Sequence, residues 1–174
     1  MIGVFLLSDQ VFWFNFMLYW AFTVVRVLID PYLPEDWFDP MRPIFRTHDW
    51  EEHGRVYRRL NIDRWKDRLP SFTRRGALSK KRLMTSDPDY LNRFVVETCR
   101  AESHHVRAVL SVVVMKLWTP LPSWLAMFAI ALTGNLPFIL IQRYNRPRLQ
   151  RALEAARRRA GGELYGAGWQ PNPA

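Results

Sequence analysis

Apolar residues are concentrated in separate segments of this chain, and these segments set its predicted architecture. The first, residues 11–29, carries a single charged residue, Arg26, and is long enough to cross most of a bilayer at about 1.5 Å per residue. A second segment covers 106–118 and a third covers 123–141, with a proline-containing stretch at 119–122 between them. The second is short for a spanning helix, whereas the third is adequate. The pattern predicts a mainly α protein with an N-terminal membrane helix and a C-terminal helix hairpin that turns at 119–122.

The N-terminal segment, residues 1–29, is predicted to be an uncleaved membrane anchor. A cleaved signal peptide has a basic start and a small-residue cleavage site. Residues 1–10 contain neither Lys nor Arg, and residues 22–26 offer no convincing cleavage motif. Because positive charge is retained in the cytoplasm, the uncharged N-terminus is expected to lie outside it.

Positive charge also sets the predicted topology of the later segments. Residues 42–82 hold thirteen Lys or Arg against five Asp or Glu, and residues 143–159 hold seven Arg against one Glu. Both flanks belong on the cytoplasmic side by the positive-inside rule. Two cytoplasmic flanks require an even number of crossings between them, so 106–141 is expected to span twice or to be re-entrant. The chain is therefore predicted to be a small integral protein of the cell membrane with a basic cytoplasmic middle region.

The overall composition narrows the class of partner. The 174 residues are 49% hydrophobic and carry a net charge of +9, which points to an anionic partner. Nucleic acid and anionic lipid both satisfy the charge, and the apolar segments favour lipid. The lone cysteine, Cys99, excludes an intramolecular disulfide and is typical of a small buried apolar residue.

The middle of the chain, residues 30–90, mixes prolines, aromatic rings and arginines. The rings are typical either of a membrane-interface surface or of the core of a small soluble domain. Residues 49–68 are expected to form a helix in which Asp49 caps toward Glu52. Around 71–85, short strands are an alternative to loops.

A helix is predicted to begin at Ser86-Asp87-Pro88, where a capping residue precedes a proline at the first helical position. On its continuation, residues 89–118, Glu97 and His105 lie on one face, and Glu102 is three residues from His105. A carboxylate beside an imidazole fixes the tautomer and raises the basicity of the ring. Such a pair suits removal of a proton from a sugar hydroxyl that attacks an acyl carbonyl.

This helix has other interpretations. Charged residues at these spacings also form an ordinary solvated face. Glu102 and His105 supply half of a di-iron pattern whose second half is missing, so no metal site is predicted. Arg100 is a candidate for holding an anionic donor. The sequence contains neither the His-x-x-x-x-Asp signature of glycerolipid acyltransferases nor a Gly-x-Ser-x-Gly elbow.

The most distinctive stretch follows the third apolar segment, at the predicted end of its helix. Residues 142–149 read Gln-Arg-Tyr-Asn-Arg-Pro-Arg-Leu, a dense cluster of hydrogen-bond donors at headgroup level. A stop-transfer flank needs only the arginines, so the tyrosine, asparagine and proline indicate a further role. Within the segment itself, Asn135 and Pro137 predict either a kink whose freed backbone group bonds to a neighbouring helix or a polar cavity for a lipid headgroup.

Two of these stretches resemble a known family. Residues 97–105, Glu-Thr-Cys-Arg-Ala-Glu-Ser-His-His, and the octet 142–149 resemble the glycosyl-4,4'-diaponeurosporenoate acyltransferases of bacterial carotenoid biosynthesis, whose type member completes staphyloxanthin. Weaker matches lie at 50–54, 65–66 and 83–85. Together the matching stretches extend from about residue 45 to 155, in the expected order.

The resemblance implies a membrane O-acyltransferase that transfers a fatty acyl group to a sugar hydroxyl of a glycosylated carotenoid or similar glycolipid. Its co-substrate would be acyl-CoA or acyl-carrier protein, and its partners would be membrane lipid, the acceptor and the acyl donor, with no bound cofactor and no nucleic acid. Residues 30–160 would form the acyltransferase-like domain, followed by a flexible tail at 161–174. The alternative is a non-enzymatic membrane adaptor that binds anionic lipid or a partner enzyme.

The residues that carry the resemblance have expected roles. His105 would act as general base, with Glu102 or Glu97 orienting it. The remaining residues would bind the donor's phosphates or stabilise the oxyanion. These substrate-binding candidates are Arg100, Arg143, Tyr144, Asn145, Arg146 and Arg148.

Overall fold

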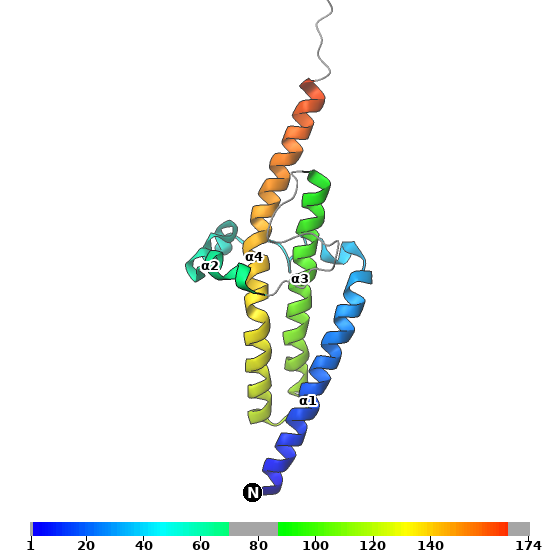
Figure 1. Ribbon diagram of the computed structural model, residues 1–174, viewed down its shortest axis with the longest axis vertical. Helices are drawn as coiled ribbons and strands as arrows, with labels where there is room; N and C mark the ends of the chain where they lie inside the picture. The colour runs from blue at the N-terminus through cyan, green and yellow to red at the C-terminus, as the bar shows by residue number, and fades with distance from the viewer. Residues whose placement is uncertain (1, 70–86, 167–174) are drawn as a thin grey trace, which may run out of the picture. The chain divides into compact units, whose positions relative to one another are not determined.

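The computed structural model describes the backbone of residues 2–69 and 87–166 and the side chains of residues 10–69 and 87–161. Over these residues helices alternate with turns and no β-strand occurs, which confirms the predicted mainly α class. The strand alternative at 71–85 lies outside the described residues. The elements are α1 (Ile2–Ile29), η1 (Asp30–Tyr32), η2 (Glu35–Phe38), η3 (Asp49–Leu60), α2 (Ile62–Trp65), η4 (Lys66–Arg68), α3 (Pro88–Met115) and α4 (Leu121–Gly166), where η marks a 3-10 helix (Figure 1).

The chain divides into two compact units. The first comprises Met1–Phe45 and Cys99–Gln142, and the second comprises Arg46–Thr98 and Arg143–Ala174. Helices α3 and α4 therefore contribute residues to both units. As a consequence, functional residues that are close together in the sequence fall in different units.

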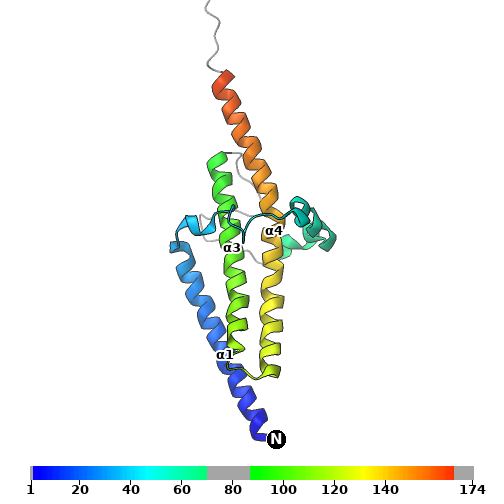
Figure 2. The same ribbon diagram turned by 180° about the vertical axis from the view of Figure 1, so that it is seen from behind.

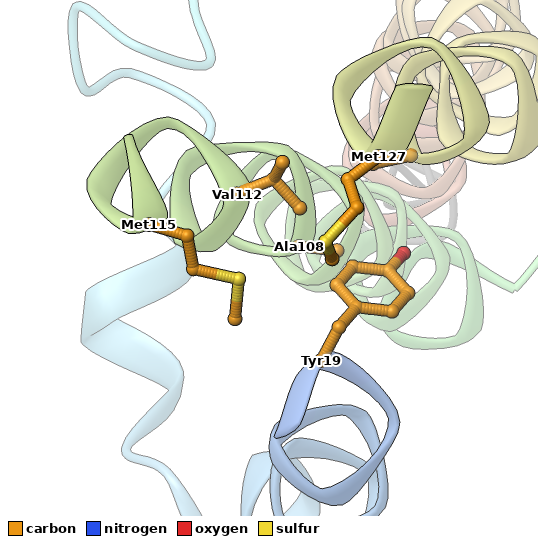
Figure 3. Packing of buried hydrophobic residues seen from close by; sticks show 6 residues of the cluster. Tyr19, Ala108, Val112, Met115 and Met127 are labelled. Atoms are coloured by element: carbon orange, nitrogen blue, oxygen red, sulfur yellow. The ribbon is translucent and has the colours of Figure 1, made fainter. Parts of the chain in front are cut away.

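In the first unit, α1 packs beside the parts of α3 and α4 that belong to the same unit (Figures 1 and 2). Tyr19 of α1 lies with Ala108 and Met127 between the three helices, and Val112 of α3 completes the packing (Figure 3). Cys99 is buried, as the sequence predicted. The apolar contacts between the helices explain why three segments far apart in sequence form one bundle.

The helices of the first unit expose many large apolar side chains, whereas several polar side chains lie inside the unit. Trp13 and Phe14 of α1 are 58% and 64% exposed, while Asn15 beside them is fully buried. A soluble bundle has the opposite arrangement, because large exposed apolar faces are unfavourable in water. Among the described residues, two helical stretches are long and apolar enough to cross a membrane: Gln10–Tyr32, which contains most of α1, and Leu121–Gly161 in α4.

The predicted turn between the second and third apolar segments is present. Helix α3 ends at Met115 and α4 begins at Leu121, so the turn lies slightly earlier than the sequence suggested. Asn15 of α1 holds this turn, since its amide donates to Thr119 Oγ1 at 2.8 Å and accepts from the indole N–H of Trp118 at 2.9 Å. A buried polar network of this kind fixes the turn against α1.

Helix α4 does not end at the octet, so that prediction is wrong. The helix runs through Pro147 to Gly166. The proline removes one N–H and leaves the carbonyl of Arg143 without its helical donor. Packing within the second unit sustains the helix, because Leu149 is buried with Phe94 and Val95 of α3. The octet is therefore an interior turn of a long helix.

The predicted single helix over 49–68 is also wrong. Glu52, His53 and Gly54 have φ values of 48°, 55° and 87°, and they break η3 within its length. The capping carboxylate is that of Glu51, which accepts a hydrogen bond from the His48 N–H at 2.7 Å, so Asp49 is not the cap. The kinked η3 and, after the left-handed Asn61, the contiguous short helices α2 and η4 replace the expected helix, because left-handed residues cannot continue one.

The aromatic residues of the middle region are divided between core and surface. Phe38 and Phe45 are buried in the first unit. Trp37 and Trp50 are exposed, at 55% and 65%. Core packing and an exposed aromatic surface therefore occur in the same part of the sequence.

Candidate active site

Helix α3 positions the predicted catalytic residues, and it begins as predicted. The Asp87 carboxylate accepts a hydrogen bond from the Tyr90 N–H at 2.8 Å, and Pro88 takes the first helical position. The site residues on this helix fall in both units: Arg100, Glu102 and His105 belong to the first, and Glu97 belongs to the second.

His105 is held by an amide side chain from α4. Its Nδ1 lies 2.9 Å from Oδ1 of Asn135, while Asn135 Nδ2 donates to the Ala131 carbonyl at 2.7 Å and to the Tyr19 hydroxyl at 3.0 Å. A backbone carbonyl only accepts, so the orientation of the amide is determined. Its Oδ1 must then accept from His105, and the neutral ring carries its proton on Nδ1. The basic lone pair is therefore on Nε2.

The ring of His105 is also fixed in its plane. It stacks on Phe138 with ring centroids 4.7 Å apart and an interplanar angle of 9°. Phe138 and Asn135 lie one turn apart on α4, so a single face of this helix orients the imidazole. The helix continues through Pro137, and the side chain of Asn135 bonds to residues of α1 and α3.

The two predicted partner carboxylates differ in their surroundings. Glu102 is 2% exposed within the first unit, and a carboxylate buried to this extent needs hydrogen-bonded or charged neighbours. Glu97 is half-buried in the second unit. Their roles in orienting His105 remain predictions.

The structure shows a carboxylate–imidazole pair that the sequence did not predict. Asp30, the first residue of η1 directly after α1, lies 2.6 Å from His104 Nδ1 and accepts a hydrogen bond from Arg107 at 2.6 Å. Its backbone carbonyl accepts from Arg100 at 2.8 Å, and the Arg100 guanidinium lies 4.8 Å from the Phe38 ring centroid. This Asp30 cluster joins the end of α1 to α3 through one buried acidic residue.

The Asp30 cluster joins Asp30 to residues seventy or more positions away. Local spacing reveals only neighbours three or four residues away on one helix. The one available signal was the position of Asp30, the first acidic residue after the apolar segment and directly before Pro31.

In the second unit, the octet arginines have different environments. Arg146 is only 1% exposed, and its guanidinium donates to the Thr98 hydroxyl at 3.0 Å and to the Thr98 carbonyl at 3.2 Å. Arg143 donates to the Arg46 carbonyl at 3.2 Å and faces Glu51 at 3.4 Å. These two arginines hold helices and turns of the second unit together.

The other octet residues differ in their exposure, and Arg148 is the most accessible of them. Arg148 is exposed, donates to the Tyr144 hydroxyl at 2.7 Å and stacks over the Tyr144 ring at 5.0 Å. The Tyr144 hydroxyl also bonds to the Asp63 carboxylate. Asn145 is half-buried. Arg143 and Arg146 therefore stabilise the second unit, whereas the guanidinium of Arg148 is accessible to solvent.

Two stretches that resembled the acyltransferase family lie against each other in the second unit. A β-carbon on Gly54 would be 3.2 Å from the Tyr144 carbonyl oxygen and 3.5 Å from Pro147. Only glycine combines this close approach with a φ of 87°. The segment 50–54 and the octet therefore form one structural element.

This element borders a cleft of about 290 Å³. The cleft is wholly within the second unit, and its walls combine residues of η3 with residues of α4. Its lining residues are His53, Gly54, Arg55, Arg58, Tyr144, Arg148 and Arg151. Within the part of the chain that the structure describes, no group of three or more His, Cys, Asp or Glu residues is arranged to hold a metal ion.

Comparison with known proteins identifies the family. The sequence model for glycosyl-4,4'-diaponeurosporenoate acyltransferase matches residues 34–155, a range that includes His105, the Gly54 turn and the octet. The chain belongs to this family. It is accordingly an acyltransferase, as the sequence predicted, and not a non-enzymatic adaptor.

Curated relatives support the assignment. A glycosyl-4,4'-diaponeurosporenoate acyltransferase of Staphylococcus aureus (strain bovine RF122 / ET3-1) is 28% identical over 146 residues, which cover 82% of this chain and 88% of the relative. The protein of the same name from Staphylococcus aureus (strain MRSA252) is 27% identical over the same shares. No solved structure matches this chain.

Proposed function

We propose that this acyltransferase transfers a fatty acyl group to a sugar hydroxyl of a glycosylated carotenoid or a similar glycolipid. The observation that carries the proposal is the family match, which extends across both units and includes the histidine and arginine stretches. The name of the relatives supplies the acceptor class, a glycosyl ester of a carotenoid acid. The donor would be an acyl thioester, either acyl-CoA or acyl-carrier protein.

The proposed location is the cell membrane. The exposed apolar faces of the first unit would contact lipid, which suits an enzyme whose acceptor carries a long apolar chain. The basic residues on 42–82 and 143–159 favour the cytoplasmic side for their own segments, where acyl thioesters are available.

His105 is proposed as the general base. Its Nε2 lone pair takes the proton of the sugar hydroxyl while the hydroxyl oxygen attacks the thioester carbonyl carbon. The tetrahedral intermediate then collapses, the carbon–sulfur bond breaks, and the departing sulfur takes the proton back from the imidazolium. Asn135 and Phe138 contribute by holding the ring in one tautomer and one orientation, which lowers the entropic cost of reaching the transition state.

His104 is the competing candidate for this step. Its Nδ1 lies 2.6 Å from the Asp30 carboxylate, which orients the ring. Arg107 binds the same carboxylate at 2.6 Å and neutralises much of its charge. The Asp30 cluster is therefore better suited to joining α1 to α3, and His105 is the preferred base.

The remaining predicted residues take supporting roles in this proposal. In the first unit, the surface that contacts the acceptor would be shaped by Arg100 and Glu102. In the second unit, the helices would be positioned by Glu97, Asn145 and Arg146. Arg143 and Tyr144 would support the turn that carries Gly54. Arg148 remains the octet residue best placed to contact substrate, because it is exposed.

The test is mass spectrometry of lipid extracts from a host that makes a glycosylated carotenoid. Expression of this chain is expected to add one fatty acyl mass to the glycoside. The His105→Ala variant should abolish the new species, while His104→Ala should retain it. A product from His105→Ala equal to that of the unaltered enzyme would overturn the assignment of the base, and absence of any acylated glycolipid with the enzyme present in the membrane would overturn the acceptor class.

A further inference from the structure

The cleft in the second unit is strongly basic. Four arginines line it, Arg55 and Arg58 from η3 and Arg148 and Arg151 from α4, and all four are exposed to solvent. His53 adds a fifth nitrogen-bearing side chain. Among the described residues of its lining, none carries a negative charge. Like charges brought together in this way repel one another, so the arrangement favours an anionic ligand between them.

The hydrogen bonds of these arginines position their guanidinium groups without neutralising them. Arg151 makes a long 3.5 Å contact to the His53 carbonyl, and Arg55 lies 3.3 Å from the Glu52 carbonyl. Both contacts are to neutral backbone groups, so they position the guanidinium without compensating its charge. The Glu52 carboxylate lies 4.0 Å from Arg55, and both side chains are exposed to solvent, so this ion pair is weak.

Arg148 is held more precisely. The Tyr144 hydroxyl gives its hydrogen to Asp63 and accepts one from Arg148, whose guanidinium also stacks on the Tyr144 ring. The stacked plane is fixed, and the guanidinium retains further N–H groups for a ligand. An arginine oriented in this way presents two parallel donors, the geometry that suits a phosphate oxygen pair.

We propose that this cleft binds the phosphate or diphosphate group of the acyl donor. Its volume of about 290 Å³ is just below the range of small-molecule sites, roughly 300–1,000 Å³, so it suits a phosphate group better than a whole nucleotide. Coenzyme A carries a diphosphate and a third phosphate, and the carrier-protein arm carries one phosphodiester. The identity of the ligand rests on the proposed acyl transfer, whereas the binding of phosphate rests on the cleft alone.

Gly54 is part of the same site. Its φ of 87° turns the chain between His53 and Arg55, and a side chain there would meet the Tyr144 carbonyl. The turn therefore brings the η3 residues of the cleft next to those of α4. The packing of the Gly54 turn on α4 gives a structural reason why the 50–54 stretch and the octet occur together in one sequence.

The experiment is calorimetric titration of the full chain in phosphatidylcholine nanodiscs with coenzyme A and, separately, with pantetheine, which lacks phosphate. Coenzyme A should bind and pantetheine should not. Arg148→Gln should weaken coenzyme A binding about tenfold or more, as should Arg55→Gln, whose side chain lies outside α4. Arg157→Gln is the control, because this arginine is exposed on α4 but does not line the cleft.

Equal affinity of both cleft variants and the unaltered protein for coenzyme A would overturn the proposal. Loss of coenzyme A binding by the unaltered protein in nanodiscs that contain phosphatidylglycerol would identify a lipid headgroup as the ligand and would also overturn it.

Acyl-transfer kinetics separate this proposal from the function itself. A raised donor KM with unchanged kcat in Arg148→Gln supports the cleft, whereas an unchanged KM would overturn the cleft and leave acyl transfer standing. Coenzyme A binding without any acyl transfer would support the cleft and overturn the function.

Discussion

Gly54 and Tyr144 lie so close together that a β-carbon on the glycine would be 3.2 Å from the tyrosine carbonyl oxygen. The contact joins a turn in η3 to the interior of α4. It depends on a φ of 87° at Gly54, which L-residues rarely adopt. The junction of these two sequence stretches is therefore sensitive to a single added methyl group.

The first prediction concerns this contact. Gly54→Ala should lower the free energy of unfolding by about 1–3 kcal/mol, because alanine is disfavoured at positive φ and its methyl group has no room. Gly134→Ala is the matched control. Gly134 is in the middle of α4 with nothing within 4 Å of an added methyl group, so its substitution should raise stability by about 0.4–1 kcal/mol. Equilibrium unfolding in detergent measures both, and changes of the same sign would contradict the proposed role of Gly54.

The second prediction concerns Glu51, which is 1% exposed and contacts the His48 N–H, the Tyr57 hydroxyl and Arg143. Glu51→Ala should cost about 3–5 kcal/mol, because it leaves a largely buried guanidinium without its counter-charge. Glu51→Gln should cost less, since its amide oxygen still accepts a hydrogen bond. The neighbouring Glu52→Gln should change stability by less than about 0.5 kcal/mol, because this side chain is solvated. An equal loss in the Glu51 and Glu52 variants would argue against a buried pair.

The features that the sequence predicted correctly are those with local signals. The Asp87 cap, the start of α3 at Pro88 and the apolar segments of α1 and α4 all depend on residues within a few positions of one another. Spacing along one helix also indicates His105 as a candidate base, and this role stays a prediction. Residues within a few positions were therefore enough to predict the cap, the start of α3 and the apolar segments.

The features that the sequence did not predict depend on tertiary packing. Glu52 and His53 adopt positive φ values that neither residue favours on its own, and the packing of the Gly54 turn on α4 stabilises them. Helix α4 continues through Pro147 because buried leucines hold it. Asp30 and His104 meet only because α1 packs beside α3.

The third prediction tests the hold of Asn135 on His105. Asn135→Ala should lower kcat more than it changes KM, because the ring loses the acceptor that fixes its tautomer. Tyr19→Phe is the control, since it removes one donor contact of the amide and leaves the contact to His105. Steady-state kinetics with a purified acceptor distinguish them, and equal kcat values in the two variants would count against the role of Asn135.

A pH profile gives the fourth prediction, for Asn135→Asp. A carboxylate next to His105 favours the imidazolium and therefore raises the pKa of the ring. Because the base must be neutral to accept a proton, the acidic limb of the kcat profile should move to higher pH. A purely structural role for this position would lower activity at all pH values and leave the limb where it was.

The fifth prediction separates stability from catalysis in the Asp30 cluster. Asp30→Asn removes the charge that binds Arg107 and His104, and it should lower the free energy of unfolding by about 1–3 kcal/mol. Asp36→Asn, at an exposed position of η2, should leave stability within about 0.5 kcal/mol. If His105 is the base, kcat per folded enzyme should stay unchanged in Asp30→Asn, as judged by activity normalised to the folded fraction. A large fall in kcat with little loss of stability would instead make His104 the base and Asp30 its partner.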